Sequence, residues 1–143
     1  MFFDPSTAQG SILGVGIDLV NACRMGTVLA RTPRLIHRLF TANEQAYART
    51  QHTPYIALAK RFAAKEAFAK AAGCGIGSIL SWTDISVERH PTGQPYIALS
   101  ESAYRNVRCH IKSNFHVVCS LTDETVASHT VAQAFVMIQR ISI

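Results

Sequence analysis

The spacing of apolar and polar residues predicts one strand followed by a group of helices in the first half of the chain. Between positions 12 and 20, glycine alternates with branched apolar residues, and this period of two is typical of a strand. From 24 to 39, arginines recur among apolar residues in a pattern that predicts a helix broken or kinked near Pro33. Thr41 and Glu44 have the spacing of a capping box, which predicts that the next helix begins there.

The clearest predicted helix is the alanine-rich segment from 53 to 72. Thr53 can act as its N-cap, with Pro54 at the first helical position. Alanine has the highest helix propensity, and Gly73 can end the helix in a left-handed conformation. We therefore expect a single long helix in the middle of the chain.

The second half of the chain is predicted to be mainly β-structure. Ser100 can cap a short helix that ends near Cys109, and turn residues between 91 and 95 join two strands into a hairpin. The predicted strands cover residues 85–89, 96–99, 115–121 and 131–138. One strand, several helices and then further strands indicate an α+β fold with a mainly antiparallel sheet.

The composition is that of one folded domain. The chain has 143 residues, of which 48% are hydrophobic and 16% charged, so it can build a single core. We expect residues 1–10 to form a loose arm and residues 11–143 to form the domain. No run reaches the roughly 18 apolar residues that a membrane span needs, so no membrane partner is predicted. Fourteen Lys and Arg against nine Asp and Glu give a net charge of +5, which favours an anionic partner.

The cysteines give no sign of a zinc site or a disulfide framework. The four are scattered, and none belongs to a CxxC pair. Reduced thiols, and first residues without the features of a secretory signal, predict a cytoplasmic protein. The four are Cys23, Cys74, Cys109 and Cys119.

Two acidic residues are the first candidates for chemistry. Asp18 lies in an otherwise apolar strand, where an acid must be at the strand end, paired, or bound to a cation. The alternative is that it caps the following helix. Glu66 lies in the long helix, and two carboxylates are the usual minimum that a protein contributes to a magnesium site, with phosphate oxygens and water completing the shell.

The densest charged cluster lies in the long helix around Glu66. Glu66 and Lys70 are four residues apart, as are Arg61 and Lys65. A solvated helix face with ordinary ion pairs would have this pattern. An excess of cations among small alanines, followed by the glycine loop 73–77, instead favours an anion site, although such a loop is equally compatible with a flexible helix end.

Six short segments carry a more specific pattern. They are residues 14–20, 40–44, 61–71, 75–77, 93–96 and 118–122. In this order they resemble the holo-acyl-carrier-protein synthase family, the small 4′-phosphopantetheinyl transferases. The resemblance covers nearly the whole chain beyond the first ten residues. Its most specific part is the Lys-Glu-Ala-x-x-Lys-Ala element with an Asp strand about fifty residues before it.

The resemblance implies the phosphopantetheinyl transferase fold and the corresponding reaction. In it, 4′-phosphopantetheine passes from coenzyme A to a serine of an acyl carrier protein or carrier domain, and 3′,5′-ADP is released. The modified carrier then serves fatty-acid or polyketide synthesis. Asp18 and Glu66 would bind Mg²⁺, and Glu66 would activate the serine hydroxyl directly or through a metal-ordered water. Lys70 would meet the pyrophosphate and offset charge on the leaving oxygen. Family members of this size form homotrimers with sites between chains.

The same resemblance implies two sets of binding residues. Arginines in the basic segment would face the acidic helix of the carrier protein, although solubilising charge is the alternative interpretation. These arginines are Arg24, Arg31 and Arg34. The residues expected at coenzyme A are Arg61, Lys65, Lys70, Gly75, Ile76, Gly77, Pro95, Ser120 and Thr122.

The chain departs from the family pattern near its C-terminus. Where the family usually has Ser-x-Ser/Thr-His, this chain has Ser120, Leu121, Thr122 and Asp123. An acid at the histidine position would repel a nucleotide phosphate. We therefore expect Asp123 to point away from the ligand or to pair with a nearby base.

Two other functions remain open from the sequence. One is a non-catalytic module that holds an acidic protein or nucleic acid with its basic helices, and the other is a degenerate family member that binds coenzyme A without turnover. The sequence has no recognisable nucleic-acid reader motif or aromatic stacking pattern, so nucleic acid is not a predicted partner. Only a transferase would need both Asp18 and Glu66.

Overall fold

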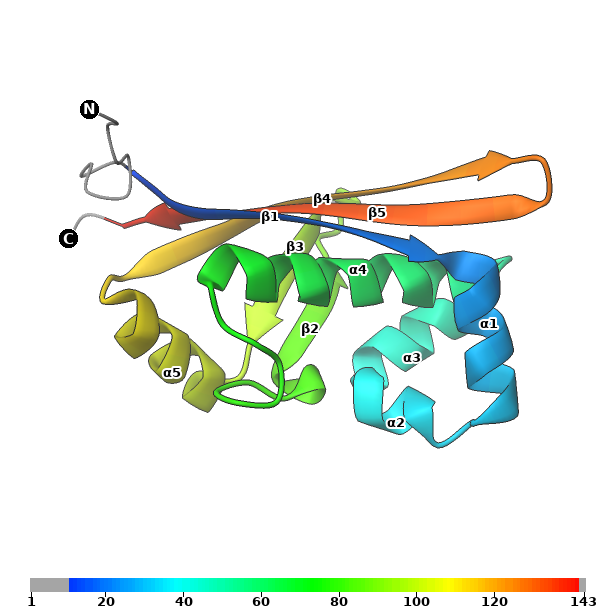
Figure 1. Cartoon of the computed structure of the whole chain (residues 1–143), viewed down its shortest axis with the longest axis horizontal. Coiled ribbons are helices and arrows are strands. Elements are labelled where there is room, and N and C mark those ends of the chain that lie inside the picture. The colour runs from blue at the N-terminus through cyan, green and yellow to red at the C-terminus, as the bar shows by residue number, and fades with distance from the viewer. Residues whose placement is uncertain (1–10, 142–143) are drawn as a thin grey trace, which may run out of the picture.

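The computed structural model describes residues 11–141 and has the predicted α+β fold. Figure 1 shows a long sheet on one side of the central helix α4 (Pro54–Ala72) and shorter helices on the other, with a small hairpin passing behind α4. The predicted arm, residues 1–10, lies outside the described residues. In chain order the elements are β1 (Ile12–Asn21), α1 (Ala22–Arg31), α2 (Leu35–Leu39), α3 (Ala42–Arg49), α4 (Pro54–Ala72), the 3-10 turn η2 (Trp82–Asp84), β2 (Ile85–Arg89), β3 (Pro95–Leu99), α5 (Glu101–Ile111), β4 (Phe115–Val126) and β5 (His129–Arg140).

The strands pair antiparallel, as predicted, but they form two sheets. β1, β5 and β4 make a three-stranded sheet in that order, while β2 pairs with β3 in a separate hairpin. β4 and β5 are longer than predicted, because their pairing continues to a tight turn in which Ala127 has a φ of 55°. The hydrophobic pattern did not reveal this extension, since the added residues are largely polar and exposed.

Three helix boundaries are set by capping residues that the sequence predicted. The Thr41 hydroxyl accepts a hydrogen bond from the Glu44 backbone N–H, and the Glu44 carboxylate accepts one from the Thr41 backbone N–H, so the capping box is present. Gly73 ends α4 with a φ of 66°, and Ser100 caps α5. Thr53 is a correction: it precedes α4, but its side chain makes no capping hydrogen bond, because its backbone is outside the usual cap conformation.

α4 lies directly on β1 because neither element has large side chains where they meet. A Cβ at Gly14 would lie 1.8 Å from the carbonyl oxygen of Ala71, and one at Gly16 would lie 1.9 Å from that of Ala67. Only glycine permits this approach of strand and helix. No helix within residues 11–141 has the length and hydropathy required to cross a membrane.

The two faces of the three-stranded sheet differ. The face toward α4 carries fully buried residues such as Val136 and Ile138. On the other face, Leu19 is 63% exposed, Ile17 is 51% exposed, and Phe135 lies opposite Ile17 in the neighbouring strand. We call this second surface the open face of the sheet; its exposed apolar residues include Val15, Ile17, Leu19, Val131 and Phe135.

Candidate active site

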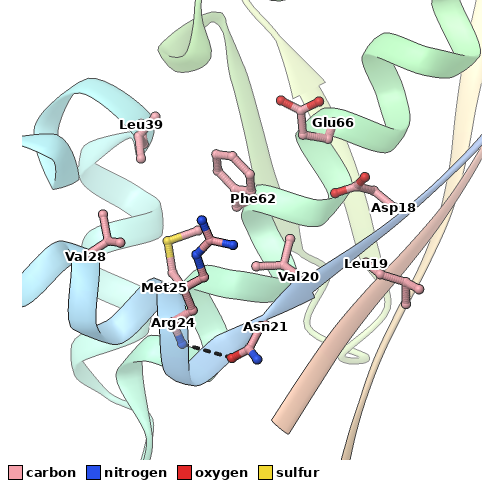
Figure 2. Close-up of a pocket in the computed structure, with 10 residues that line it drawn as sticks. All are labelled: Asp18, Leu19, Val20, Asn21, Arg24, Met25, Val28, Leu39, Phe62 and Glu66. Atoms are coloured by element: carbon pink, nitrogen blue, oxygen red, sulfur yellow. Dashed lines mark hydrogen bonds between the residues drawn. The ribbon is translucent and has the colours of Figure 1, made fainter. Parts of the chain in front are cut away.

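β1 and α4 place two carboxylates and a lysine beside one another. Asp18 points toward α4, because it lies on the same face of β1 as Gly16. Lys70 Nζ lies 2.7 Å from Asp18 Oδ1 and donates a second hydrogen bond, of 3.0 Å, to the carbonyl oxygen of Ile17. Glu66 lies one turn before Lys70, and Figure 2 shows its carboxylate facing the same cavity as that of Asp18. The structure thus brings together the three residues predicted to be catalytic.

These carboxylates border a cavity of about 480 Å³ between β1, α1 and α4 (Figure 2). This volume lies in the range of small-molecule sites, and the mixture of an apolar wall with a few charged groups is typical of them. Leu39 and Phe62 contribute to the apolar wall, and Arg24 from α1 is the one cation among the described residues that line the cavity.

The electrostatics of Asp18 and Glu66 suit this pair to accept a proton and to bind a cation. Burial raises the pKa of Glu66, the nearby charge of Asp18 raises it further, and Lys70 acts in the opposite direction. Mg²⁺ commonly uses one or two carboxylates together with water and substrate phosphates, so Asp18 and Glu66 fit it. Within residues 11–141, no group of three or more His, Cys, Asp and Glu side chains could hold a metal ion. A cation at this pair would therefore need oxygens from substrate or water.

The basic segment forms α1 and α2, which Pro33 separates as predicted. Asn21 caps α1 by accepting a hydrogen bond of 2.9 Å from the backbone N–H of Arg24. Arg24, Arg31 and Arg34 are all exposed. Because Arg24 also lines the cavity, this cationic surface adjoins the two carboxylates.

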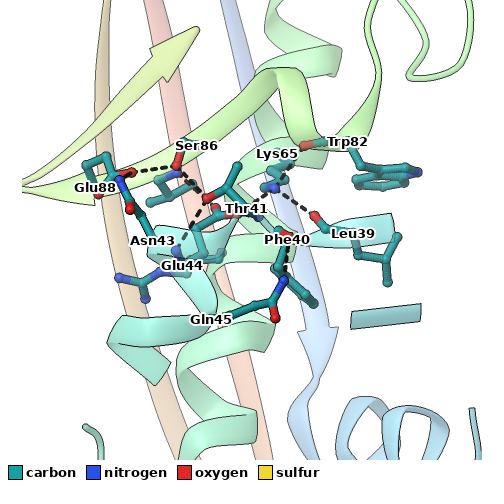
Figure 3. A network of polar contacts seen from close by, with 12 residues as sticks. Leu39, Phe40, Thr41, Asn43, Glu44, Gln45, Lys65, Trp82, Ser86 and Glu88 are labelled. Atoms are coloured by element: carbon teal, nitrogen blue, oxygen red, sulfur yellow. Dashed lines mark hydrogen bonds and ion pairs between the residues drawn. The ribbon is translucent and has the colours of Figure 1, made fainter. Parts of the chain in front are cut away.

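Lys65 is completely buried, which corrects the prediction that it contacts coenzyme A. Its ammonium lies 2.7 Å from Glu44 Oε2 and donates to the carbonyl oxygens of Leu39, at 2.7 Å, and Trp82, at 2.9 Å (Figure 3). These partners use all three ammonium protons. Burial lowers the pKa of Lys65, while Glu44 opposes this change. Lys65 therefore joins α4 to α2, α3 and η2 instead of facing a ligand.

Arg61 is a second correction, because only 1% of this residue is exposed. Its guanidinium lies 3.9 Å from the ring centre of Tyr47, and Nη1 donates to the carbonyl oxygen of Ala57 at 3.2 Å. Burial lowers the pKa of Arg61. Within the described chain, Arg61 is part of the interior and offers no surface to a nucleotide phosphate.

The glycine loop that follows α4 is open to solvent. A Cβ at Gly75 or Gly77 would meet nothing within 4 Å, so the loop leaves room for a ligand beside it. Gly77 has a φ of 108°, which explains the preference for glycine at that position. Ile76 is half-buried, and Pro95 begins β3 in the separate hairpin. The loop begins at Gly73, three residues beyond Lys70, whereas Pro95 belongs to the hairpin of β2 and β3.

Ser120 and Thr122 are exposed but do not lie near the two carboxylates. The register of β4 places Ser120 opposite Phe135 and Thr122 opposite Gln133, so both side chains lie on the open face. Asp18 lies on the face that is covered by α4. One chain alone therefore does not bring these two hydroxyls to the cavity.

Asp123 pairs with a base, as hypothesised. Lys60 Nζ lies 2.6 Å from Asp123 Oδ1. Asp123 is opposite Ala132 in the sheet, so it lies on the face toward α4 and not on the open face. The acid that replaces the usual histidine is therefore compensated by a lysine of α4.

Comparison with known proteins decides the family. The model described as the 4′-phosphopantetheinyl transferase superfamily matches residues 14–132. The chain belongs to this superfamily. This confirms the resemblance that the short segments carry, and the match includes most of β1 and all of α4 and β4.

Relatives and solved structures of the superfamily agree with this assignment. The holo-[acyl-carrier-protein] synthase of Cereibacter sphaeroides is 42% identical over 131 residues, which are 90% of this chain and 93% of the relative. That of Shouchella clausii is 45% identical over 98 residues, 66% of this chain and 82% of the relative. The crystal structure from Neisseria meningitidis has a TM-score of 0.78 at 30% identity and covers 90% of this chain and 99% of that one. The Bacillus anthracis enzyme in complex with CoA (3′,5′-ADP) has a TM-score of 0.71 at 28% identity, covering 92% and 100%.

The sequence did not predict the buried residues that support the cavity wall of this superfamily member. Glu44 was predicted only as a capping residue, yet it is the buried partner of Lys65. Phe62 lines the cavity and stacks on Trp82 with ring centres 4.8 Å apart, and the Trp82 carbonyl oxygen binds Lys65. No spacing rule could have found the pair, because Glu44 and Lys65 are 21 residues apart and meet through tertiary packing.

Proposed function

We propose that the protein is a Mg²⁺-dependent holo-[acyl-carrier-protein] synthase with Asp18, Glu66 and Lys70 as its catalytic residues. Superfamily membership assigns the transfer of 4′-phosphopantetheine from coenzyme A to a carrier-protein serine, a step of fatty-acid biosynthesis. Asp18, Glu66 and Lys70 meet beside one cavity, next to the cationic helix α1, and this juxtaposition is the main support for their roles.

Glu66 is the proposed general base. The serine Oγ attacks the phosphorus that carries the pantetheine arm, the bond from that phosphorus to the 3′,5′-ADP oxygen breaks, and the hydroxyl proton passes to Glu66 directly or through a water. Burial and the neighbouring Asp18 raise the pKa of Glu66, which strengthens its affinity for this proton.

Lys70 is proposed to offset the negative charge that develops on the departing phosphate oxygen. Its side chain is 53% exposed, so its ammonium can reach a phosphate that enters the cavity. A Mg²⁺ held by Asp18 and Glu66 would supply further neutralisation of the diphosphate. The proposed coenzyme A contacts in the loop and hairpin are Gly75, Ile76, Gly77 and Pro95.

The carrier protein is proposed to dock on α1 and α2 through Arg24, Arg31 and Arg34. Opposite charge on the two surfaces would speed their encounter and make it sensitive to salt. Arg31→Glu should raise the KM for the carrier several-fold and flatten its salt dependence. Arg105→Glu is the matched control, because Arg105 is an exposed arginine on α5. Equal effects of the two variants would show that only net charge matters.

We further propose a homotrimer in which neighbouring chains cover the open face. Ile17, Leu19 and Phe135 form an exposed apolar surface there, and Ser120 and Thr122 lie on the same face. Coenzyme A contacts from these hydroxyls would then come from between two chains. Sedimentation equilibrium should give three times the chain mass, and Phe135→Glu should dissociate the assembly. A folded monomer in the wild type would contradict this arrangement.

We place the enzyme in the cytoplasm. The cysteines at positions 23, 74, 109 and 119 are free thiols, which suits a reducing compartment. Burial raises the pKa of Cys119 to about 11 and also raises that of Cys74, so both are poor nucleophiles. The proposed mechanism accordingly gives cysteine no covalent role.

The transferase activity can be tested by intact mass spectrometry of an apo acyl carrier protein. Incubation with this protein, coenzyme A and Mg²⁺ should add the mass of one phosphopantetheine group. The gain should be absent with EDTA and with Glu66→Ala. If several carriers gain no mass while coenzyme A still binds, the protein is a binder without turnover.

A further inference from the structure

Lys70 occupies the carboxylate that the proposed function assigns to a divalent cation. Its ammonium lies 2.7 Å from Asp18 Oδ1 and is also held by the Ile17 carbonyl oxygen at 3.0 Å. We propose that Lys70 competes with the divalent cation for Asp18, and that coenzyme A relieves this competition by drawing Lys70 to its diphosphate. This inference rests on the proposed function and adds an order to the binding of cation and coenzyme A.

The competition follows from charge and geometry. Asp18 and Glu66 together carry two negative charges toward the cavity, and Lys70 compensates one of them. A divalent cation that bound either oxygen of Asp18 would lie within a few ångströms of the ammonium, where like charges repel strongly. The cation therefore binds weakly while Lys70 stays on Asp18, and tightly once Lys70 has left.

Lys70 can leave Asp18 at little cost. Its side chain is 53% exposed, and ion pairs at such positions contribute little to stability, typically below about 1 kcal/mol. The ammonium has three donors and uses two of them here, so a phosphate oxygen can engage the third before the others are released. Coenzyme A carries a diphosphate whose charge-assisted hydrogen bonds would replace those that Lys70 gives up.

The consequence is a positive coupling between the two ligands. Coenzyme A raises the affinity for the cation by removing Lys70 from Asp18, and the cation must raise the affinity for coenzyme A by the same factor. Lys70 acts in this way as a positioning residue in the resting enzyme, before any role it has in transfer. Without coenzyme A, the Asp18–Lys70 pair lowers the affinity of the site for cations.

The test is a titration with Mn²⁺, followed by electron paramagnetic resonance of the free ion, without carrier protein so that no turnover occurs. In the absence of coenzyme A, Lys70→Gln should bind Mn²⁺ more tightly than the wild type, on the order of tenfold. Coenzyme A should increase the Mn²⁺ affinity of the wild type by a larger factor than that of Lys70→Gln.

Lys60→Gln is the matched control. It removes the same charge from the same helix and also breaks a Lys–Asp ion pair, of 2.6 Å, but that pair does not line the cavity. Its Mn²⁺ affinity should equal that of the wild type. Circular dichroism of each variant establishes that the fold is unchanged.

Two results overturn the inference in different ways. If Mn²⁺ binds the wild type through Asp18 but Lys70→Gln binds it no more tightly, the competition is absent while the proposed metal pair stands. If Asp18→Asn binds Mn²⁺ as well as the wild type, the cation lies elsewhere, and the proposed metal pair fails together with the competition.

Discussion

Two lysines of α4 make ion pairs of the same length and serve different purposes. Lys65 lies 2.7 Å from Glu44 with both side chains 0% exposed, whereas Lys70 lies 2.7 Å from Asp18 with exposures of 53% and 17%. Lys65 has three fixed partners inside the fold, while Lys70 has two at the edge of a cavity. Distance alone therefore does not distinguish a structural pair from one that can exchange partners; burial and unused donors do.

The helix geometry explains how neighbouring lysines reach such different surroundings. Five residues rotate an α-helix by about 140° beyond one full turn, so Lys60, Lys65 and Lys70 point in three directions. Their partners come from three elements, Asp123 in β4, Glu44 in α3 and Asp18 in β1. One regular sequence spacing thus connects α4 to three parts of the fold.

The largest effect is expected at the buried pair. Lys65→Met should lower the free energy of unfolding by about 3–5 kcal/mol, because it leaves the Glu44 carboxylate buried without a counter-charge. Urea unfolding followed by circular dichroism measures this loss. The double variant Glu44→Gln with Lys65→Met removes both charges and should recover much of it. A loss below about 1 kcal/mol for Lys65→Met would place this pair in the same class as surface pairs.

At the Lys70–Asp18 pair beside the cavity, we expect a small effect on stability and a large effect on activity. Lys70→Gln should change the free energy of unfolding by less than about 1 kcal/mol, because the lysine is largely solvated. Its kcat for transfer to an apo carrier protein should fall roughly 100-fold, as expected for loss of a group that stabilises developing charge. Lys70→Arg retains the charge and should recover part of the rate. A stable variant with normal kcat would remove Lys70 from the catalytic residues.

The third pair is intermediate in exposure, and its loss should have a smaller effect. Lys60 and Asp123 are 21% and 33% exposed, so Asp123→Asn should cost less than about 1 kcal/mol of unfolding free energy. Because the pair lies away from the cavity, kcat should remain within about twofold of wild type. A large loss of kcat would mean that the compensated acid takes part in substrate binding after all.

The smallest effect is expected at a carboxylate that has no lysine. Asp84 accepts hydrogen bonds from the Ser81 backbone N–H and from the Ser100 and Ser81 hydroxyls, and these lower its pKa from the ordinary 3.8. Its contribution to stability is present above that ordinary pKa and is lost as the pH falls through the lowered one. The free energy of unfolding of Asp84→Asn should therefore fall slightly less than that of the wild type as the pH drops below 3.8. Urea unfolding at several pH values measures this difference. An unchanged pH dependence would contradict this role.

Local signals predicted most of the elements because they depend on neighbouring residues. The Thr41–Glu44 capping box and the Gly73 helix end are set within a few positions, and both are present. The site triad was predicted from a resemblance of motifs, since nothing in the spacing of Asp18 and Glu66 fixes their approach. The structure supplies that approach through the contact of β1 with α4.

The predicted ligand contacts that the structure does not bring to the cavity have a common physical cause. Arg61 and Lys65 look like surface cations in the sequence, because burial of a charge depends on partners that are distant along the chain. Glu44 is such a partner, and Tyr47 covers Arg61. Likewise, Ser120 shares a motif with other predicted ligand residues but lies on the opposite face of the sheet from Asp18, which only the strand register reveals.

The bare contact between β1 and α4 sets a limit for engineering. Gly16 faces the backbone of Ala67 with no room for a methyl group, so Gly16→Ala would push the helix away from the strand. That displacement would move Glu66 away from Asp18 without touching either residue. Variant libraries made to find enzymes that transfer modified pantetheine arms should therefore keep the residues of this contact unchanged. They should vary the apolar side chains that line the cavity, at Leu39 and Phe62.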